Sequence, residues 1–267
     1  MFIPHTNSDR ESMLKNIGVN SIDALFENLP GCNPDSPLKL PSPTTEMEAF
    51  SEISYIASVN ESTQELSSFL GAGAYHHYIP AAVDAILRRG EFYTAYTPYQ
   101  PEISQGTLQT VFEFQSLMAA LTGMEASNAS HYDGATAVAE AINMAYHNFR
   151  GNRKKIILSP ALHPHYRETV HTYTQGTDLQ ILGEDLSPSS TPQDLMALID
   201  QETALVVVQY PDFYGRIYDF SALAEAAHNA KALIAIHVNP LALGILTPPG
   251  EMGADIVTGE GLSLIHI

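Results

Sequence analysis

The densest group of side chains that could do chemistry lies between Phe69 and Gln105. Two stretches rich in glycine and proline, FLGAGAYHHYIP and GEFYTAYTPYQPEISQG, carry five tyrosines. Glycine and proline predict irregular backbone, and long loops rich in aromatic groups are where a scaffold commonly places binding residues. The alternative is a surface loop whose rings only cover the core, and composition alone leaves both interpretations open.

A second candidate is the sequence SHYDGATA at residues 130–137, which we expect at a strand-to-helix turn. The amide groups at a helix N-terminus can bind a phosphate group. Here, however, the carboxylate of Asp133 is placed to cap the helix itself and to occupy the anion site from within the chain. A self-capped helix is therefore the favoured interpretation.

Other catalytic patterns are missing or weak. The sequence GAG at residues 71–73 has neither the spacing nor the preceding strand of a dinucleotide site, and GxxxxGK[ST] and GxSxG do not occur. The histidines at 76–77 and 163–165 have no acidic or cysteine neighbours in sequence, so we expect no metal site. Cys32 stands in a proline-rich loop without an identifiable base.

Lysine is scarce, with five residues at positions 15, 39, 154, 155 and 231. A lysine that forms a Schiff base must be desolvated and must lie near a group that binds the cofactor's anion. The first two lysines belong to the N-terminal region, and we expect the other three at solvated strand entries. The sequence therefore offers no lysine suited to an aldehyde cofactor.

The elements that must position these groups begin at about residue 105. We expect strands at residues 156–158, 179–182, 205–209, 233–238 and 255–258, and helices at 107–121, 135–147, 164–175, 191–200 and 221–230. Apolar strands separated by helices predict βαβ units. The expected fold class is therefore α/β, with a mostly parallel sheet covered on both faces.

Residues 1–65 are expected to form a helical arm, which wraps either its own core or another subunit. We expect helices over about residues 7–15, 22–27 and 46–59, because side chains that cap helices precede each of them. The third begins with Thr45 and Glu48, which fit a capping box. Between the second and third helices, GCNPDSPLKLPSP contains four prolines and excludes a regular element.

Composition narrows the possible partners and location. The chain carries 30 acidic and 12 basic side chains, a formal charge of −18, which repels phosphate backbones and anionic lipids. We therefore expect neither nucleic acid nor membrane binding. The single cysteine excludes an intramolecular disulfide, and the N-terminus has no pattern of a signal or transit peptide. These features favour a cytoplasmic location.

Six segments carry a resemblance to a known family: FLGAGAYHHYIP, GEFYTAYTPYQPEISQGTLQ, ASNASHYDGATAVAEA, HPHYRETV, VVVQYPDFYG and NPLALGILTPPGEMGADIVTGEG. They closely resemble subunit 1 of the split form of the glycine cleavage system P-protein, glycine dehydrogenase (decarboxylating). The resemblance covers residues 1–261, and YTAYTPYQPEISQG is its most specific part.

This resemblance implies the aminotransferase type of fold, fold type I of the pyridoxal-phosphate enzymes, with residues 66–261 as an incomplete large domain. It also implies a heterotetramer of two plus two subunits, in which subunit 2 holds pyridoxal phosphate on its lysine. Such a complex decarboxylates glycine and passes the aminomethyl group to the lipoyl arm of the H-protein. Subunit 1 keeps the fold, lacks the lysine and contributes loops to the neighbouring active site.

The same resemblance suggests which residues this chain lends to the partner's site. We expect tyrosine hydroxyls to orient the glycine carboxylate or the lipoyl thiol, and a glutamate to position a proton donor. The candidate catalytic residues are Tyr96, Tyr99, Gln100, Glu102, Ser104 and Gln105.

No residue of this chain is expected to bind the cofactor. The strand at 255–258 is followed by Gly259-Glu260-Gly261 instead of a lysine. Asn239 falls where active members of the fold hold an aspartate against the pyridine nitrogen, and an amide cannot stabilise a protonated ring by charge.

The end of the chain departs from the family pattern. Leu262 replaces a usual glutamine, and the glycine-rich run expected after residue 264 is missing. A βα fold that stops after a strand leaves an uncovered edge. We therefore expect the C-terminal small domain to be missing and residues 262–267 to be a non-native or truncated tail.

Two other functions remain as alternatives. An independent pyridoxal-phosphate lyase or aminotransferase would need a suitable lysine, which the sequence does not offer. A catalytically silent structural or regulatory partner of a pyridoxal-phosphate enzyme predicts that the second subunit is fully active without this chain.

Overall fold

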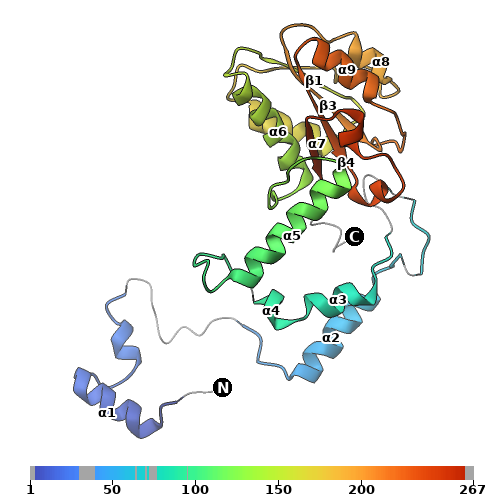
Figure 1. Ribbon diagram of the computed structural model, residues 1–267. Coiled ribbons are helices and arrows are strands. Elements are labelled where there is room, and N and C mark those ends of the chain that lie inside the picture. Colours follow the sequence, from blue (N-terminus) through green and yellow to red (C-terminus); the bar gives the residue numbers. More distant parts are fainter. Residues whose placement is uncertain are drawn as a thin grey trace. The chain divides into compact units, whose positions relative to one another are not determined.

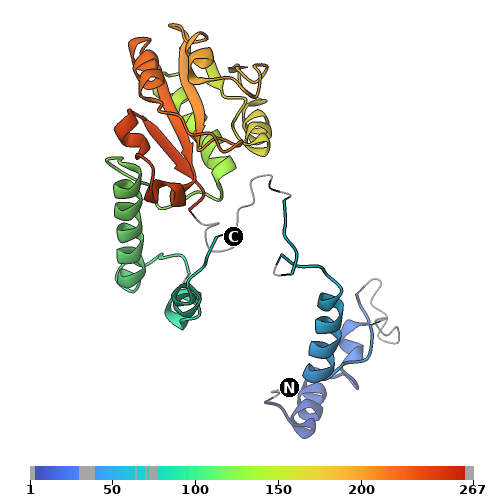
Figure 2. The ribbon, with the colours of Figure 1, turned by 90° about the vertical axis from the view of Figure 1, so that its right-hand side faces the viewer.

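The computed structural model describes residues 4–29, 40–63, 65–69, 71, 77–94 and 96–261. The chain divides into two compact units, Met1–Ser68 and Phe69–Ile267, which are described separately (Figures 1 and 2). Several expectations fall on residues outside the described ones. They concern Cys32, Lys39, residues 72–76 of the GAG and histidine segment, and the tail at 262–267.

The N-terminal unit contains the helices α1 (Asn7–Ile17) and α2 (Glu46–Ser58) and the 3₁₀ helix η1 (Asp23–Phe26). Capping boxes open α1 and α2, as the Thr45 hydroxyl accepts from the Glu48 amide and the Glu48 carboxylate accepts from the Thr45 amide. Both expected helices are confirmed. The expected helix at residues 22–27 is instead a single 3₁₀ turn.

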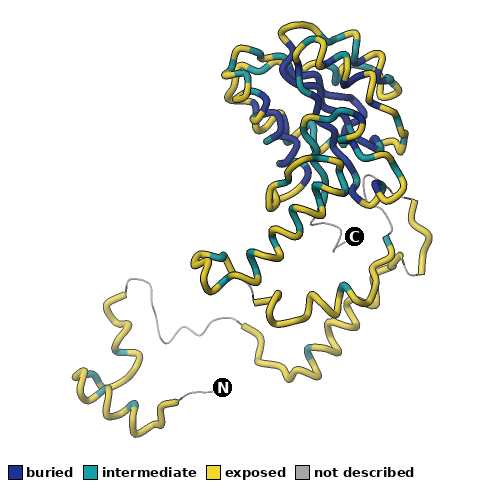
Figure 3. Tube along the Cα trace, viewed as in Figure 1, coloured by how far each residue is buried: buried dark blue, intermediate teal, exposed yellow. Residues whose placement is uncertain are grey.

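The helices of this unit do not bury their apolar side chains. No residue of α1, η1 or α2 is buried, and Figure 3 shows this part of the chain as mostly exposed, with a few residues of intermediate burial. On α2, Met47 is 79% exposed, Phe50 75% and Ile53 65%. Helices of this length gain most of their stability from packing an apolar face. The exposed apolar face of α2 is therefore suited to packing against another protein surface.

The second unit begins with two short helices, α3 (Ala81–Leu87) and α4 (Gly90–Tyr93). The expectation of irregular backbone was wrong here. Pro80 lies at the N-cap in an extended conformation, and the sequence AAVDAIL that follows is rich in helix formers. The glycines and prolines of this segment therefore lie at the ends of its helices and do not prevent helix formation.

Helix α5 (Gln105–Thr122) connects this region to the sheet. It has no buried residue, but Leu121 near its C-terminal end packs against the hydrophobic core. Gly123 ends the helix at φ +72°, where a Cβ would lie 3.2 Å from the Cβ of Pro248. The end of α5 is thus anchored beside the sheet, whereas the rest of the helix alternates between exposed and intermediate residues (Figure 3).

Ten elements follow α6 (Gly134–Asn148) in βα order. They are β1 (Lys155–Leu158), α7 (Pro164–Thr174), β2 (Gln180–Leu182), α8 (Pro192–Met196), β3 (Thr203–Tyr210), α9 (Ser221–Asn229), β4 (Leu233–Val238), η2 (Pro240–Gly244), η3 (Pro249–Met252) and β5 (Ile256–Gly259). The five expected strands are confirmed, and α8 ends earlier than the helix expected at 191–200.

The strands form one parallel sheet in the order β2-β1-β3-β4-β5. Alternate residues face two hydrophobic clusters: Val206, Val208 and Ile236 pack toward α8 and α9, whereas Leu205 and Ala235 pack toward α6 and α7. The expected α/β fold with a parallel sheet covered on both faces is confirmed (Figures 1 and 3). Within the described residues, none of the helices combines the length and the apolar character needed to cross a membrane.

The strand order changes direction at β1, because β2 lies on one side of it and β3 on the other. In open α/β sheets, ligands bind beyond the carboxyl ends of the strands at such a switch point. The turn after β3 shapes this end of the sheet, and its centre is the buried side chain of Asp212. Asp212 Oδ1 accepts from the amides of Tyr214 and Arg216 at 2.9 Å, and Oδ2 accepts from Arg216 Nε at 2.6 Å.

We expect Asp212→Asn to lower the free energy of unfolding by on the order of 2–4 kcal/mol, because it removes a buried charge that pairs with Arg216. Urea denaturation followed by circular dichroism measures this change. The control is Asp185→Asn on the exposed surface, which should change stability by less than about 0.5 kcal/mol. Equal losses in the two variants would contradict this role of Asp212.

Candidate functional site at the carboxyl ends of the strands

Three polar side chains form a row across the ends of β3, β4 and β5. Gln209 is paired in register with His237, and His237 with Thr258. All three face α6 and α7, because they follow the alternation of Leu205, Ala235 and Ile256. A hydrogen bond of 3.0 Å joins His237 Nδ1 and Thr258 Oγ1, and Gln209 Oε1 accepts from the amide of His163 at 2.9 Å.

Aromatic rings from the start of α7 cover this strand-end row. The ring of Tyr166 meets that of His237 edge to face at 4.8 Å. His163 stacks on Tyr166 at 4.9 Å and meets Phe213 edge to face, also at 4.9 Å. Such ring pairs fix each other's orientation, so the Tyr166 hydroxyl is held beside the row.

The N-terminus of α6 lies against the same row. Asp133 Oδ1 accepts from the Thr136 amide at 2.7 Å, so the expected self-capped helix is confirmed. The expected strand-to-helix turn was wrong, because among residues 96–133 the described chain contains α5 and a loop before α6, and no strand.

A second carboxylate reaches this helix from the segment after β5. Glu260 Oε1 accepts from the Gly134 amide at 2.5 Å and from the Tyr166 hydroxyl at 3.0 Å. A Cβ at position 134 would lie 2.7 Å from Glu260 Oε1, 2.9 Å from His237 Cε1 and 2.9 Å from the Tyr166 hydroxyl. Only glycine leaves room for this close approach.

His237 is neutral at physiological pH. Its ring is buried, and burial, followed by the charge of nearby His163, lowers the pKa of His237 from 6.5 to about 3. A neutral imidazole can donate one hydrogen bond and accept another, but it supplies no positive charge for an anion.

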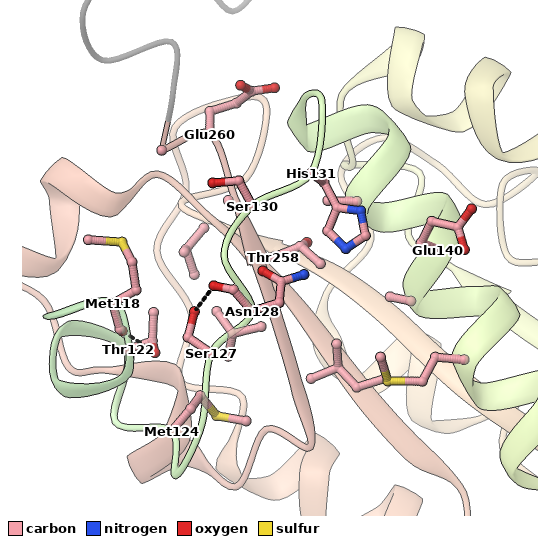
Figure 4. Close-up of a pocket in the computed structure, with 18 of the residues that line it drawn as sticks. Met118, Thr122, Met124, Ser127, Asn128, Ser130, His131, Glu140, Thr258 and Glu260 are labelled. Atoms are coloured by element: carbon pink, nitrogen blue, oxygen red, sulfur yellow. Dashed lines mark hydrogen bonds between the residues drawn. The ribbon is translucent and has the colours of Figure 1, made fainter. Parts of the chain in front are cut away.

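A cavity of about 560 Å³ adjoins the N-terminus of α6 and the edge of β5. Figure 4 shows side chains from four parts of the chain around it: Met118 and Thr122 from α5, the loop from Met124 to His131, Glu140 from α6, and Thr258 and Glu260 at the end of β5. Its described lining contains four carboxylates, those of Asp133, Glu140, Asp255 and Glu260, and neither lysine nor arginine.

The candidate residues lent to a partner lie elsewhere. The side chains of Tyr96 and Tyr99 are 90% and 91% exposed. The amide of Ser104 donates to the carbonyl of Gln100 at 3.2 Å, and Gln105 Nε2 donates to the carbonyl of Glu102 at 3.1 Å. The structure therefore gathers residues 100–105 in one turn, which leads into α5 at Gln105. Figures 1 and 2 place this turn at the end of α5 that points away from the sheet.

The strand-end row is the part of the site that the sequence interpretation missed. The histidines were judged by their neighbours in sequence, whereas His237 obtains its partners from β3, β5, α6 and α7. A usable signal was present, because polar residues at the carboxyl ends of apolar parallel strands meet at one edge of the sheet. Among the described residues, no group of three histidine, cysteine, aspartate or glutamate side chains is arranged to hold a metal ion.

Comparisons with known proteins agree along nearly the whole chain. A family model described as "Glycine cleavage system P-protein" matches residues 1–264. The chain is 50% identical over 266 residues to the "Probable glycine dehydrogenase (decarboxylating) subunit 1" of Thermomicrobium roseum, covering 99% of this chain and 59% of the relative. The protein of the same description from Geobacillus kaustophilus is 48% identical, with 97% of this chain and 58% of the relative covered.

Solved structures are similar to this chain at two levels, one in sequence and fold and one in fold alone. A crystal structure of glycine decarboxylase (P-protein) of the glycine cleavage system, in inhibitor-bound form, matches with a TM-score of 0.83 and 41% identity, covering 99% of this chain and 59% of that chain. A NifS-like protein matches with a TM-score of 0.50 at 14% identity, over 66% of this chain and 49% of its own, which shows a shared fold alone. The chain spans about three fifths of the length of its curated relatives.

Gly134→Ala should lower the free energy of unfolding by on the order of 1–3 kcal/mol, because the added methyl group collides with three side chains of the site. Urea denaturation measures the loss. Gly90→Ala is the matched control, since Gly90 also begins a helix and a Cβ there meets nothing within 4 Å. A tolerated alanine at position 134 would contradict the tight packing around this helix N-terminus.

The buried His237 should make stability depend on pH. The unfolded chain binds a proton near pH 6.5 and the folded chain only near pH 3, so the contribution of His237 is present above pH 6.5 and is lost as pH falls toward 3. The slope reaches about 1.4 kcal/mol per pH unit.

His237→Asn should reduce this slope, because the amide keeps a polar atom near Thr258 but does not titrate. The titratable groups near His237 in the described chain include His163, Tyr166 and the Glu260 carboxylate, and all three remain in the variant. Replacing the exposed His5 by asparagine should leave the slope unchanged. Unfolding curves between pH 4 and 7 test this, and an unaltered slope in His237→Asn would disprove it.

Proposed function

Because the chain belongs to the glycine cleavage system P-protein family, we propose that it acts as the lysine-free first subunit of a two-subunit glycine decarboxylase. In this proposal a second subunit holds pyridoxal phosphate, and the complex decarboxylates glycine and passes the aminomethyl group to the lipoyl arm of the H-protein. The description "subunit 1" of the relatives supports a partner subunit. We further propose a heterotetramer of two plus two subunits in the cytoplasm.

One observation carries the assignment of a lysine-free role. The described strand-end site does not fit pyridoxal phosphate: Glu260 follows β5 in place of an amine, and its carboxylate already accepts from the first amide of α6. Asn239 follows β4, and its side chain accepts from the Leu241 amide at 3.1 Å as a cap for η2. Pyridoxal phosphate needs an amine, free amides that bind its phosphate and an acid that pairs with its ring nitrogen. The described strand-end site offers none of these three groups.

The chain's own chemical contribution is therefore assigned to the loop before α5. Its tyrosine hydroxyls at 96 and 99 are exposed, so they are available to a neighbouring subunit. In this proposal the hydroxyls orient the carboxylate of glycine or the lipoyl thiol, and Glu102 positions a proton donor. Gln100, Ser104 and Gln105 belong to the same turn and set its shape.

Exposed apolar side chains support the idea that this region meets another protein surface. Next to the loop, Tyr93 is 82% exposed and Ile103 77%, and on α5 Phe112 is 69% exposed. Apolar groups gathered in this way commonly mark interaction sites. In the proposed assembly they pack against the second subunit and place the loop at its active site.

Reconstitution tests the proposed function. The chain, the lysine-bearing subunit and lipoylated H-protein are combined, and release of carbon dioxide from glycine is measured with each subunit alone and with both together. Activity that requires both subunits supports the proposal. Full activity of the second subunit alone would favour the alternative of a silent structural or regulatory partner.

Tyr96→Phe and Glu102→Gln should each lower kcat of the complete complex by about tenfold to a hundredfold, because each removes a hydroxyl or an ionisable group assigned to the reacting centre. Subunit association, followed by gel filtration, should not change. The matched controls are Tyr173→Phe on α7 and Glu225→Gln on α9, which remove the same groups from exposed positions outside the loop. Wild-type turnover in both loop variants would remove this assignment.

A further inference from the structure

We propose that the carboxylate of Glu260 is a built-in occupant of the anion site at the N-terminus of α6, and that it closes the strand-end cavity of this chain to phosphate-bearing ligands. The inference concerns this chain's own cavity and stands independently of the loop assigned to the partner.

The first step is that α6 would otherwise be a suitable anion site. The helix has 15 residues. Its first residue, Gly134, lies beside the carboxyl ends of β4 and β5. Helix N-termini in this position bind phosphate through their free amides and the positive end of the helix dipole. The structure uses these amides differently, since carboxylates of the chain accept from Gly134 and Thr136.

The second step is that the Glu260 carboxylate occupies a built site. Its Oε1 is shared between the Gly134 amide and the Tyr166 hydroxyl. Tyr166 is held in turn by its contacts with His163 and His237. The same oxygen lies 2.7 Å from where a Cβ of residue 134 would be, so the carboxylate fills the space directly in front of the helix.

The third step is that charge, and not lack of room, excludes a phosphate group. The cavity of about 560 Å³ is within the range of roughly 300–1,000 Å³ that holds small ligands. However, Asp133 and Glu260 place two carboxylates at one helix N-terminus, whose dipole supplies only about half a positive charge. The described lining includes His131 and His147, but no lysine or arginine that would balance the two carboxylates. His237, which lies outside the lining, is neutral.

Glu260→Ala in the 267-residue chain tests the proposal, with inorganic phosphate as the probe. Isothermal titration calorimetry should detect phosphate binding in the variant at least about tenfold tighter than in the wild type. Adding Asp133→Asn should tighten it further, because asparagine caps a helix as well as aspartate does but carries no charge.

Two control variants separate occupancy from a general loss of acidic charge. Glu260→Gln should bind phosphate more tightly than the wild type but more weakly than Glu260→Ala, since it loses the negative charge while its amide oxygen can still accept from Gly134 and Tyr166. Glu251→Ala removes an exposed carboxylate from η3 and should change nothing. Phosphate binding that rises equally in either control would overturn the proposal, as would wild-type protein that binds phosphate as tightly as Glu260→Ala.

Thermal unfolding followed by circular dichroism shows whether each variant is folded. If Glu260→Ala does not fold, Tyr166→Phe replaces it in the test, because it removes the hydrogen bond that the Tyr166 hydroxyl donates to the carboxylate. A smaller gain in phosphate affinity is then expected. A folded Glu260→Ala or a folded Tyr166→Phe that gains no affinity would refute the closure by Glu260.

Discussion

The parallel direction of all five strands is the constraint on which the site depends. Since every strand runs the same way, each strand's carboxyl end reaches the same edge of the sheet, and the pairing of His237 with Gln209 and Thr258 follows from the register alone. A shift of one residue in β4 would turn His237 toward α9 and remove it from α6 and α7. Burial of the sheet on both faces fixes that register, because both sets of alternating side chains are packed.

Under the proposed function, the same edge explains why this chain would leave the cofactor to a partner subunit. The position after β5 reaches the N-terminus of α6, so whichever side chain stands there meets the helix dipole directly. A lysine in this region would bring an amine, but Glu260 brings a negative charge that the helix amide and the Tyr166 hydroxyl stabilise. Through Glu260, the edge of the sheet carries an internal contact that joins the segment after β5 to α6 and α7.

Local sequence signals predicted local structure well and long-range contacts poorly. The Thr45–Glu48 capping box and the Asp133 cap join residues three positions apart, and both were correctly predicted. Strands were found from their apolar runs. The contact of Glu260 with Gly134 spans 126 positions and that with Tyr166 spans 94, so neither could follow from spacing. The helices α3 and α4 were missed because glycine and proline at their ends hid the helix formers between them.

The distribution of burial gives the candidate loop its physical setting. The helices from α1 to α5 contain no buried residue in the described chain, whereas α6 alone contains seven. A helix that exposes Phe112 and Leu117 at 69% and 65% forgoes roughly 1.5–3 kcal/mol of favourable transfer for each such side chain. Packing of this surface against a partner would recover that free energy and would order the adjacent turn at residues 100–105. Catalytic precision in the loop would then depend on assembly, because a loop is positioned only as well as the scaffold that holds it.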